Sequence, residues 1–578
     1  MPLPQRLPRR LSKGLFLSAM ALGLMLPGVR AQAPSAPESD PNKPLFEEWV
    51  IILLDDKPCG FGSTITSRSD TASGPQYQTI HQEEFVVKRH GTALKMIDTS
   101  KITEDAEGGV LSFTQSYQGT GSLIESSGRR EGNDLVVTSR GQTKRYPLPR
   151  LDALGPEAVR RLAHALPLQA DQAFSYKTFS SDYPQAAVIQ TGKVAGQETR
   201  DIRGTSRNLW KITSETNIMP GLAATEWVDD QNNDVESLVV IPGIGNLHQY
   251  VTTRAECMKQ PEGVEIFSTH LIRPQRALPS PGEQVSAVYR LIPVELSQKI
   301  DLWNQGEQKV ISSEPGLCQI EVTAPHFTPA NATWALPHAD TPELHDYLQA
   351  TSYLEVGSPE IQALAKQAIG TEKNPVVAAQ LIERFVRRYI TKKDLDIGFA
   401  SAAETAKSRE GDCTEHAVLC AALGRAVGLP TRCVFGFGYI PPGVEAAALA
   451  NTVDKDTGLF GFHMWAEAWI GPNKWVPMDA ALDGFDVGHI AISKTALEEV
   501  NPLVELNAPV LQLMESLKIE IVKTVSKSEA AAQVAAKAAA KQAAASLNHV
   551  PVPSPATPAR TSPNSPPASS SRLPPGVD

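Results

Sequence analysis

Short apolar runs separated by turn-forming clusters fill the first half of the chain. Four of these runs span residues 49–54, 84–87, 93–97 and 134–138. Runs of this length, bounded by Gly, Asp and Ser, are typical of strands in an antiparallel sheet. One stretch, residues 151–166, has helical spacing instead and interrupts the strands. The pattern predicts a mostly antiparallel β-rich domain of unknown role over residues 45–293.

After residue 350 the apolar positions change to a helical period. Ser358 is a candidate N-cap, followed by a proline and an acidic residue in the first turn. A second helix is expected to begin at Asn374 and a third at Asp412. Strand-like segments follow at residues 432–440, 462–470 and 475–479. Helices followed by a sheet predict an α+β domain over residues 350–500.

The remaining segments are distinguished by composition, and the chain is expected to be multidomain. Residues 32–44 are predicted to be a linker, and residues 294–349 a connecting segment. Residues 501–548 are predicted to form a helical extension rich in Ala and Lys. Residues 549–578 are rich in Pro and Ser, so we expect a disordered tail.

The first 31 residues have the layout of a signal peptide. A basic start precedes a short apolar stretch and a small-residue cleavage site that ends at Ala31. The apolar stretch is too short to span a bilayer comfortably, which favours cleavage over retention as an anchor. Since no cysteine follows it, a lipoprotein is not expected. We predict a periplasmic or secreted protein.

Composition narrows the classes of partner. The 578-residue chain has a formal net charge of −10, which argues against a nucleic-acid surface. All six cysteines follow the predicted cleavage site, but their spacing is not that of a dense disulfide framework, and we expect few or no bridges.

Cys413 is the candidate nucleophile. Asp412 can cap the predicted helix, and Glu415 lies three residues later, so the pair can form a capping box. Cys413 would then occupy the first helical position, where unpaired backbone N–H groups and the helix dipole favour a thiolate. Gly411 is expected to leave space for a substrate to approach the sulfur.

His463 and Asp479 are the expected partners of the thiol. His463 would act as general base and then as general acid, and Asp479 would hold its imidazole in the required tautomer. Residues 471–474 look like the turn of a hairpin, and a simple four-residue turn would place the two side chains on opposite faces. Either a bulge or a different turn realigns Asp479, or Asp483 or Asp486 takes its place.

A zinc site is the chemical alternative on the same helix. Cys413, His416 and Cys420 lie on one helix face, and Cys433 could be a fourth ligand of a tetrahedral site. Cys420 and Cys433 also fit as small buried core residues. His416 is expected at the surface or behind the site. We favour the nucleophile and predict no metal and no cofactor.

Four segments together resemble the core of the transglutaminase-like superfamily, in particular its secreted bacterial branch. They are Gly-Asp-Cys-Thr-Glu-His-Ala at 411–417, residues 423–432, His-Met-Trp at 463–465 and Trp-Val-Pro-Met-Asp at 475–479. The likeness implies a papain-like α+β fold with a Cys–His–Asp triad, which maps onto Cys413, His463 and Asp479. It extends to His489, for which we expect a structural role. The family includes cross-linkers, deamidases, peptidases and inactive members.

Two hypotheses of function follow. The first is an exported cysteine acyl-transfer enzyme that acts on peptide or isopeptide amides of a protein or peptide substrate through a thioester. Hydrolysis is favoured over cross-linking, because water is abundant and no amine-acceptor pocket is evident. The second is a non-catalytic envelope scaffold whose large sheet binds a partner or lipid. The strand rhythm of that sheet is similar to that of half-barrel lipid and lipoprotein carriers of the bacterial envelope.

Overall fold

The structure is a computed structural model. It describes residues 44–89, 92–119, 123–139, 142–148, 152–219, 222–241, 245–259, 261, 263–265, 271–294, 299–300, 302–392, 400–442, 456–482, 484–497 and 517–547. The predicted signal peptide and proline-rich tail lie outside these residues. The chain divides into two compact units, Met1–Ser526 and Lys527–Asp578. Within the described ranges, no helix is both long and apolar enough to cross a bilayer.

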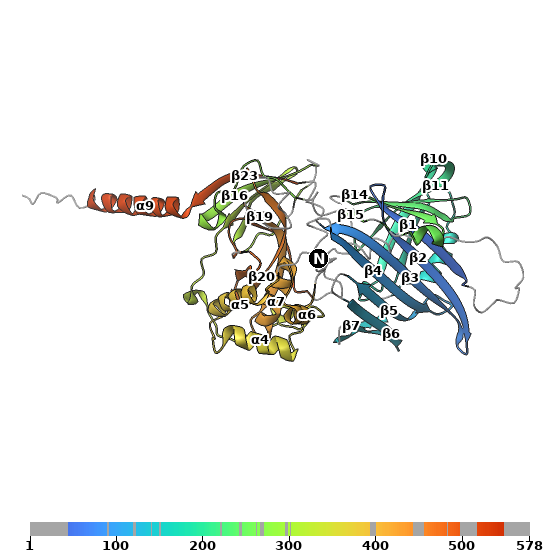
Figure 1. Cartoon of the computed structure of the whole chain (residues 1–578), viewed down its shortest axis with the longest axis horizontal. Helices are drawn as coiled ribbons and strands as arrows, with labels where there is room; N and C mark the ends of the chain where they lie inside the picture. The colour runs from blue at the N-terminus through green and yellow to red at the C-terminus, as the bar shows by residue number, and fades with distance from the viewer. Residues whose placement is uncertain are drawn as a thin grey trace, which may run out of the picture. The chain divides into compact units, whose positions relative to one another are not determined.

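A large antiparallel sheet occupies the region where the sequence predicts it (Figure 1). Its order is β8-β7-β6-β5-β4-β3-β2-β1-β14-β13-β12-β11-β10-β9, and the short β15 pairs with β3 in parallel. The strands are β1 Phe46–Leu54, β2 Lys57–Thr71, β3 Gly74–Arg89, β4 Thr92–Glu104, β5 Val110–Gln118, β6 Leu123–Glu131, β7 Asp134–Ser139, β8 Gln142–Pro147, β9 Ala173–Thr178, β10 Val188–Ile202, β11 Thr205–Thr216, β12 Ala224–Val228, β13 Asp234–Ile241, β14 Gly245–Thr252 and β15 Val264–Glu265.

The path of the chain explains this order. Each strand from β2 to β8 pairs with the one before it, and α2 (Pro156–His164) then interrupts the sheet where helical spacing predicts a helix. The strands from β9 to β14 return to β1, and β14 pairs with it. The sheet is therefore two consecutive meanders joined at β1, and the short helix α3 (Arg254–Cys257) follows its last long strand.

One face of β1 carries both a hydrophobic core and a buried carboxyl group. Val50, Ile52 and Leu54 alternate along the strand and pack in one cluster, as the period of a half-buried strand requires. Glu48 continues the same face, and it shares a small cavity with Glu226 of β12. Burial raises the pKa of Glu48 to about 7 and that of Glu226 to about 8.

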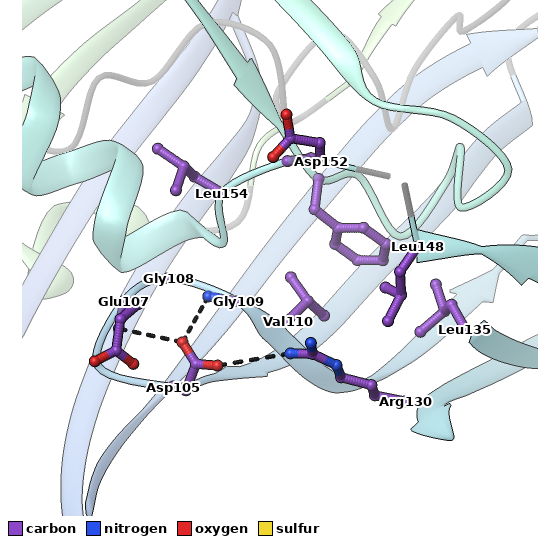
Figure 2. A pocket seen from close by; sticks show the side chains of 12 residues that line it. Asp105, Glu107, Gly108, Gly109, Val110, Arg130, Leu135, Leu148, Asp152 and Leu154 are labelled. Atoms are coloured by element: carbon purple, nitrogen blue, oxygen red, sulfur yellow. Dashed lines mark hydrogen bonds and ion pairs between the residues drawn. The ribbon is translucent and has the colours of Figure 1, made fainter. Parts of the chain in front are cut away.

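A larger cavity of about 710 Å³ lies at the turn between β4 and β5. Figure 2 shows its apolar floor and the acidic turn at its rim. Asp105 accepts hydrogen bonds from the backbone N–H groups of Glu107 and Gly109 and lies 3.7 Å from Arg130. These contacts satisfy the Asp105 carboxylate.

A second, four-stranded sheet has the order β17-β18-β16-β23 and corrects three predictions. Its strands are β16 Gln284–Pro293, β17 Gln308–Glu314, β18 Leu317–Thr323 and β23 Leu517–Ser526. Thus β16 does not belong to the large sheet, residues 294–349 are more than a connection, and the first described part of the predicted helical extension is a strand. Among the described residues of that extension, α9 (Lys527–Leu547) is the helical part.

β23 is a strand and not a helix because its apolar residues occur at every second position. Leu517, Ile519 and Ile521 are buried and face the core, while Lys518 between them is exposed. Alternation of this kind, with β-branched residues, favours a strand over a helix.

The predicted α+β domain is present, with helices before strands. The helices are α4 Pro359–Ile369, α5 Pro375–Tyr389, α6 Ala402–Ser408 and α7 Cys413–Ala426. The sheet order is β21-β20-β19-β22, with β19 Thr431–Ile440, β20 Leu459–Gly471, β21 Lys474–Met478 and β22 His489–Thr495. Both α5 and α7 pack on β20 (Figure 1).

The helix α7 is the centre of this domain. It contacts α4, α5 and α6 as well as β19 and β20, and every residue from Glu415 to Arg425 is buried. A helix that is apolar all round is stable only inside a core. The same core includes Tyr289, Ile320 and Ile519, so the β16–β18–β23 sheet packs with the α+β domain.

Candidate active site

The start of α7 has the predicted capping box. The Asp412 carboxylate accepts a hydrogen bond from the backbone N–H of Thr414 at 2.8 Å, and the Glu415 carboxyl accepts one from the Asp412 N–H at 2.9 Å. Cys413 is the first helical residue, as expected. Of the six cysteines it alone is of intermediate exposure, and the other five are buried.

Gly411 has a different role from the expected one. A Cβ atom at this position would lie 2.3 Å from Cβ of Glu415, and the residue has a φ of +155°. The space beside the glycine is therefore filled by the capping side chain and is not open to a substrate. Glycine is required here because it lets Glu415 fold back over the helix start.

Glu415 reduces the negative charge next to the thiol. The side chain is fully buried, and burial, followed by the charge of Asp412, raises the pKa of its carboxyl to about 8. The raised pKa favours the protonated, uncharged form of Glu415. It still accepts the N–H of Ala400 at 2.7 Å. A neutral Glu415 opposes formation of a Cys413 thiolate less than a carboxylate would.

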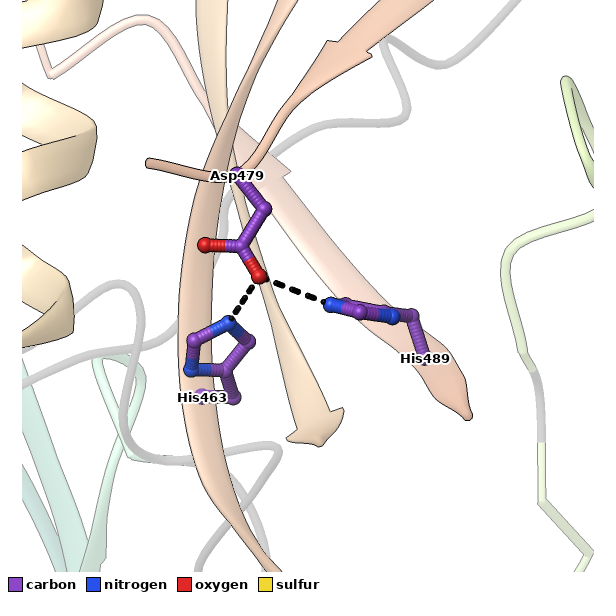
Figure 3. A group of neighbouring side chains, drawn as sticks. All are labelled: His463, Asp479 and His489. Atoms are coloured by element: carbon purple, nitrogen blue, oxygen red, sulfur yellow. Dashed lines mark hydrogen bonds and ion pairs between the residues drawn. The ribbon is translucent and has the colours of Figure 1, made fainter. Parts of the chain in front are cut away.

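His463 and Asp479 are bonded as predicted. The imidazole Nε2 of His463 donates to Oδ2 of Asp479 at 2.9 Å (Figure 3). Both side chains are buried, at 5% and 1% exposure. A Cβ at Gly438 of the neighbouring strand would lie 3.0 Å from His463, so that glycine leaves room for the imidazole. Asp479 is thus the partner of the histidine. Of the alternatives, Asp486 contacts His489 instead, and Asp483 lies outside the described residues.

A bulge at Ile470 resolves the question of the hairpin. At the turn Gly471 pairs with Lys474, but beyond it Trp469 pairs with Trp475, and the register shifts between Trp469 and Gly471. Because β20 has one extra residue at the bulge, each side chain of β20 beyond it shares a face with a different set of β21 side chains than in a regular hairpin. This places Asp479 on the face of His463, where an unbulged hairpin would have put it on the opposite one.

The surroundings of Asp479 hold it charged and in place. Its Oδ1 accepts the backbone N–H groups of Ala481 and Leu482 at 3.0 and 3.2 Å. Arg387 of α5 donates to its backbone carbonyl at 2.8 Å. Burial alone would raise the pKa of Asp479, but the charge and hydrogen bond of His463, together with those of His489, hold it well below its usual value.

His489, for which the sequence analysis expected a structural role, also bonds to Asp479. Its Nε2 bonds to the same Oδ2 of Asp479, also at 2.9 Å (Figure 3). Burial would lower its pKa, but the bonds to Asp479 and Asp486 raise it to about 9. The spacing of Asp486 and His489, three residues apart just beyond Asp479, was the only local signal for this contact.

Cys413 and the bonded group come from elements that pack together. The helix that begins with Cys413 lies against β20, which carries His463. Because Nε2 of His463 donates to a carboxylate, its Nδ1 is the ring atom that can accept a proton. The arrangement offers a thiol at a helix start, a base of fixed tautomer and a buried carboxylate.

The four residues of the zinc alternative do not meet. Among the described residues, Cys413, His416, Cys420 and Cys433 do not form a group whose ligand atoms lie close enough together to hold a metal. Burial raises the pKa of the Cys433 thiol to about 12 and that of Cys420 well above its usual value. His416 is 1% exposed, so of its two expected positions the surface is wrong, and its Nδ1 lies 2.5 Å from the Asp412 carbonyl oxygen at the start of α7.

Within the described residues, a different trio has ligand atoms close enough for a metal: His463, Asp479 and His489, with all atoms within 4.8 Å. Both Nε2 atoms donate to Asp479 and so carry protons. Their lone pairs are not available to an ion, and the trio is better described as a hydrogen-bonded group.

Comparison with known proteins agrees with this description of the domain. Residues 362–480 match the family model of the transglutaminase-like superfamily, so the chain contains a transglutaminase-like domain. The matched range includes Cys413, His463 and Asp479 and ends before His489.

A protein of similar sequence is known from a bacterium. An uncharacterized protein of Haemophilus influenzae (strain ATCC 51907 / DSM 11121 / KW20 / Rd) is 25% identical over 151 residues, which is 24% of this chain. The aligned region spans 40% of that protein's length.

Two solved structures are similar to parts of the chain. One is a putative cysteine protease from Cytophaga hutchinsonii, with 17% identity, 42% of this chain and 84% of that chain covered, and a TM-score of 0.27. The other is a beta-barrel-like protein of a domain of unknown function from Brucella abortus, with 12% identity, 36% and 95% coverage, and a TM-score of 0.26.

Proposed function

We propose that the protein is a cysteine-nucleophile acyl-transfer enzyme acting on peptide or isopeptide amides. One observation carries the proposal: the His463–Asp479 hydrogen bond is buried on the strand against which the Cys413 helix packs. A base with its tautomer fixed by a carboxylate, on a strand that packs against a helix with a thiol at its start, fits the arrangement of nucleophilic catalysis.

The first half of the reaction forms a thioester. Nδ1 of His463 takes the thiol proton, and the Cys413 sulfur attacks the amide carbonyl carbon. The backbone N–H of Cys413 is the proposed donor to the oxyanion that develops. When the C–N bond breaks, His463 returns its proton to the departing amine. Asp479 stabilises the imidazolium that forms between the two steps.

The second half depends on the acceptor. Water, deprotonated by His463, attacks the thioester carbonyl and releases a carboxylic acid and the thiol. An amine in its place would form a new amide and a cross-link. We favour hydrolysis, as a peptidase or deamidase, because water needs no binding pocket of its own.

The location and partners belong to the same proposal. Removal of residues 1–31 as a signal peptide would place the enzyme in the periplasm or outside the cell, where its substrate is a protein or peptide of the envelope. The large sheet of β1–β14 would then bind or position that substrate, and the tail would be an extension beyond the catalytic domain.

A second candidate is a non-catalytic envelope scaffold. The observation in its favour is the cavity of about 710 Å³ in the large sheet, which has the volume of a ligand site. Here the transglutaminase-like domain would serve as a folded module, and Cys413 would be an ordinary thiol.

The reactivity of Cys413 separates the two candidates. We expect iodoacetamide to alkylate it at pH 7 at least tenfold faster than a free model thiol, and His463→Ala to remove that excess, since the base that activates the sulfur is lost. Peptide mapping assigns the label among six cysteines. The exposed His345→Gln variant is the control for replacement of a histidine bonded to an aspartate. An ordinary rate in the wild type would support the scaffold.

A further inference from the structure

The bond between His489 and Asp479 has a consequence for the base. A carboxylate oxygen that accepts from two imidazoles divides its negative charge between them. Both Nε2–Oδ2 distances are 2.9 Å, so the two histidines compete for Asp479 on equal geometric terms. The state of His489 therefore affects how strongly Asp479 stabilises a protonated His463.

The other side of the His489 ring favours a charged imidazole. Its Nδ1 lies 3.1 Å from the backbone carbonyl oxygen of Asp486 and 3.2 Å from the Asp486 carboxylate, both acceptors. The backbone N–H of Asp486, also at 3.2 Å, is a contact of Nδ1 that suits a neutral ring instead. Two acceptors, one of them ionised, outweigh one donor.

The walls around His489 are aromatic and exclude water. The side chain is 2% exposed, the Phe485 ring stacks on it at 4.5 Å, and the Trp465 ring meets it edge-on at 5.4 Å. A protonated imidazole is stabilised by the face of an aromatic ring. In such surroundings the charge of His489 is weakly screened, so its effect on Asp479 is strong.

Few other ionisable groups border this cluster. Arg387 of α5 donates to the Asp479 backbone, and Glu383 pairs with Arg387 at 3.1 Å. On β16, the Tyr289 hydroxyl donates to the Val487 carbonyl. Only His489 donates directly to the Asp479 carboxylate besides His463 among the described side chains.

We propose that His489 is a positively charged positioning residue: it holds the Asp479 carboxylate and weakens its pull on the proton of His463, so that His463 releases this proton more readily. The proposal rests on the proposed function, in which His463 exchanges its proton twice in each cycle. An orienting carboxylate without this second histidine would stabilise the imidazolium more and slow proton return.

The test is the pH profile of Cys413 alkylation by iodoacetamide between pH 4 and 11. In the wild type we expect the rate to rise as the thiolate–imidazolium pair forms, reach a plateau, and change again as His463 loses its proton. His489→Gln retains a donor for Asp479 but removes the charge. We expect its upper transition to move to higher pH by about half a unit or more, as loss of a neighbouring cation does.

A second variant tests the same inference if His489→Gln fails to fold. Asp486 is 28% exposed at its side chain, and Asp486→Asn removes the anion that supports the charge on His489. We expect a shift in the same direction and of smaller size, with an unchanged melting temperature. His345→Gln, at an exposed histidine also bonded to an aspartate, should leave the profile unchanged.

The outcomes are distinct. If the plateau of His489→Gln falls while both transitions stay at their wild-type pH, His489 is only structural and the inference is wrong. The inference is also wrong if both variants match the wild type. If the wild type itself gives a single rise at the pH of an ordinary thiol, the proposed function fails first.

Discussion

Asp479 accepts hydrogen bonds from two histidines through one oxygen, and it reaches them from the end of a short strand. The sequence motif predicted that His463 and Asp479 are bonded, and the structure has this bond. The alternation of side chains along a simple hairpin predicted instead that the two residues lie on opposite faces. The register at the turn does place the two side chains on opposite faces. The bulge at Ile470 then shifts the register by one residue and brings them to the same face. A bulge depends on packing across the sheet, which no local pattern records.

The capping box shows where residue-level prediction succeeds. Asp412 and Glu415 lie within one turn, so their bonds are fixed by spacing alone. The role of Gly411 could not be predicted in the same way, because a glycine indicates that a side chain is absent but not what fills the space. His489 was expected to be structural, because its sequence position does not show that it bonds to Asp479.

The buried carboxyl of Glu226 makes a testable contribution to stability. Neither of its oxygens has a hydrogen-bond partner among the described residues, and its exposure is 2%. Burial raises its pKa from 4.5 to about 8. The folded state thus keeps a proton that the unfolded chain loses, so this stabilising contribution is complete below pH 4.5 and is lost as the pH rises through 8.

Glu226→Gln removes this titration. We expect the variant to match the wild type within about 1 kcal/mol near pH 5 and to exceed it by a few kcal/mol at pH 9, since each pKa unit corresponds to about 1.4 kcal/mol. Urea unfolding at both pH values measures the difference. The exposed Glu215→Gln on β11 is the matched control. An equal difference at pH 5 and pH 9 would contradict the assignment.

At the scale of elements, the largest difference between prediction and structure is β23, a strand where a helix was predicted. Its apolar residues alternate, but the Ala- and Lys-rich stretch that follows them suggested one continuous helix. The partner of β23 is β16, more than two hundred positions earlier in the chain. The helices α4, α5 and α7 were predicted well, because caps and helical periods are local signals.

Two truncations test the role of β23. A chain that ends at Ser526 loses α9 and the tail, and we expect its melting temperature to stay within about 2 °C of that of the full chain. A chain that ends at residue 516 also loses Leu517, Ile519 and Ile521 from the core. At about 1.5–3 kcal/mol for each buried side chain, this loss is comparable to the whole stability of a domain.

We therefore expect the shorter chain to be unfolded or insoluble at 25 °C, as judged by circular dichroism. If it melts cooperatively near the temperature of the chain ending at Ser526, β23 is dispensable and its packing has been overestimated.

At the scale of the whole molecule, the chain combines a transglutaminase-like domain with a much larger antiparallel sheet. The class of that sheet was predictable from its short apolar runs, whereas its order was not. The pair β1–β14 joins residues about two hundred positions apart, and only tertiary contacts decide it.

Mass spectrometry of envelope proteins incubated with the full-length protein tests the central claim most directly. Wild-type protein should produce new peptide termini, or the mass increase of deamidation, in discrete substrates, and Cys413→Ala should produce none of them. Covalent joins between substrate chains would instead identify an amine acceptor and still support the thioester. Identical product spectra from wild type and Cys413→Ala, with both proteins folded, would contradict a nucleophilic role for Cys413.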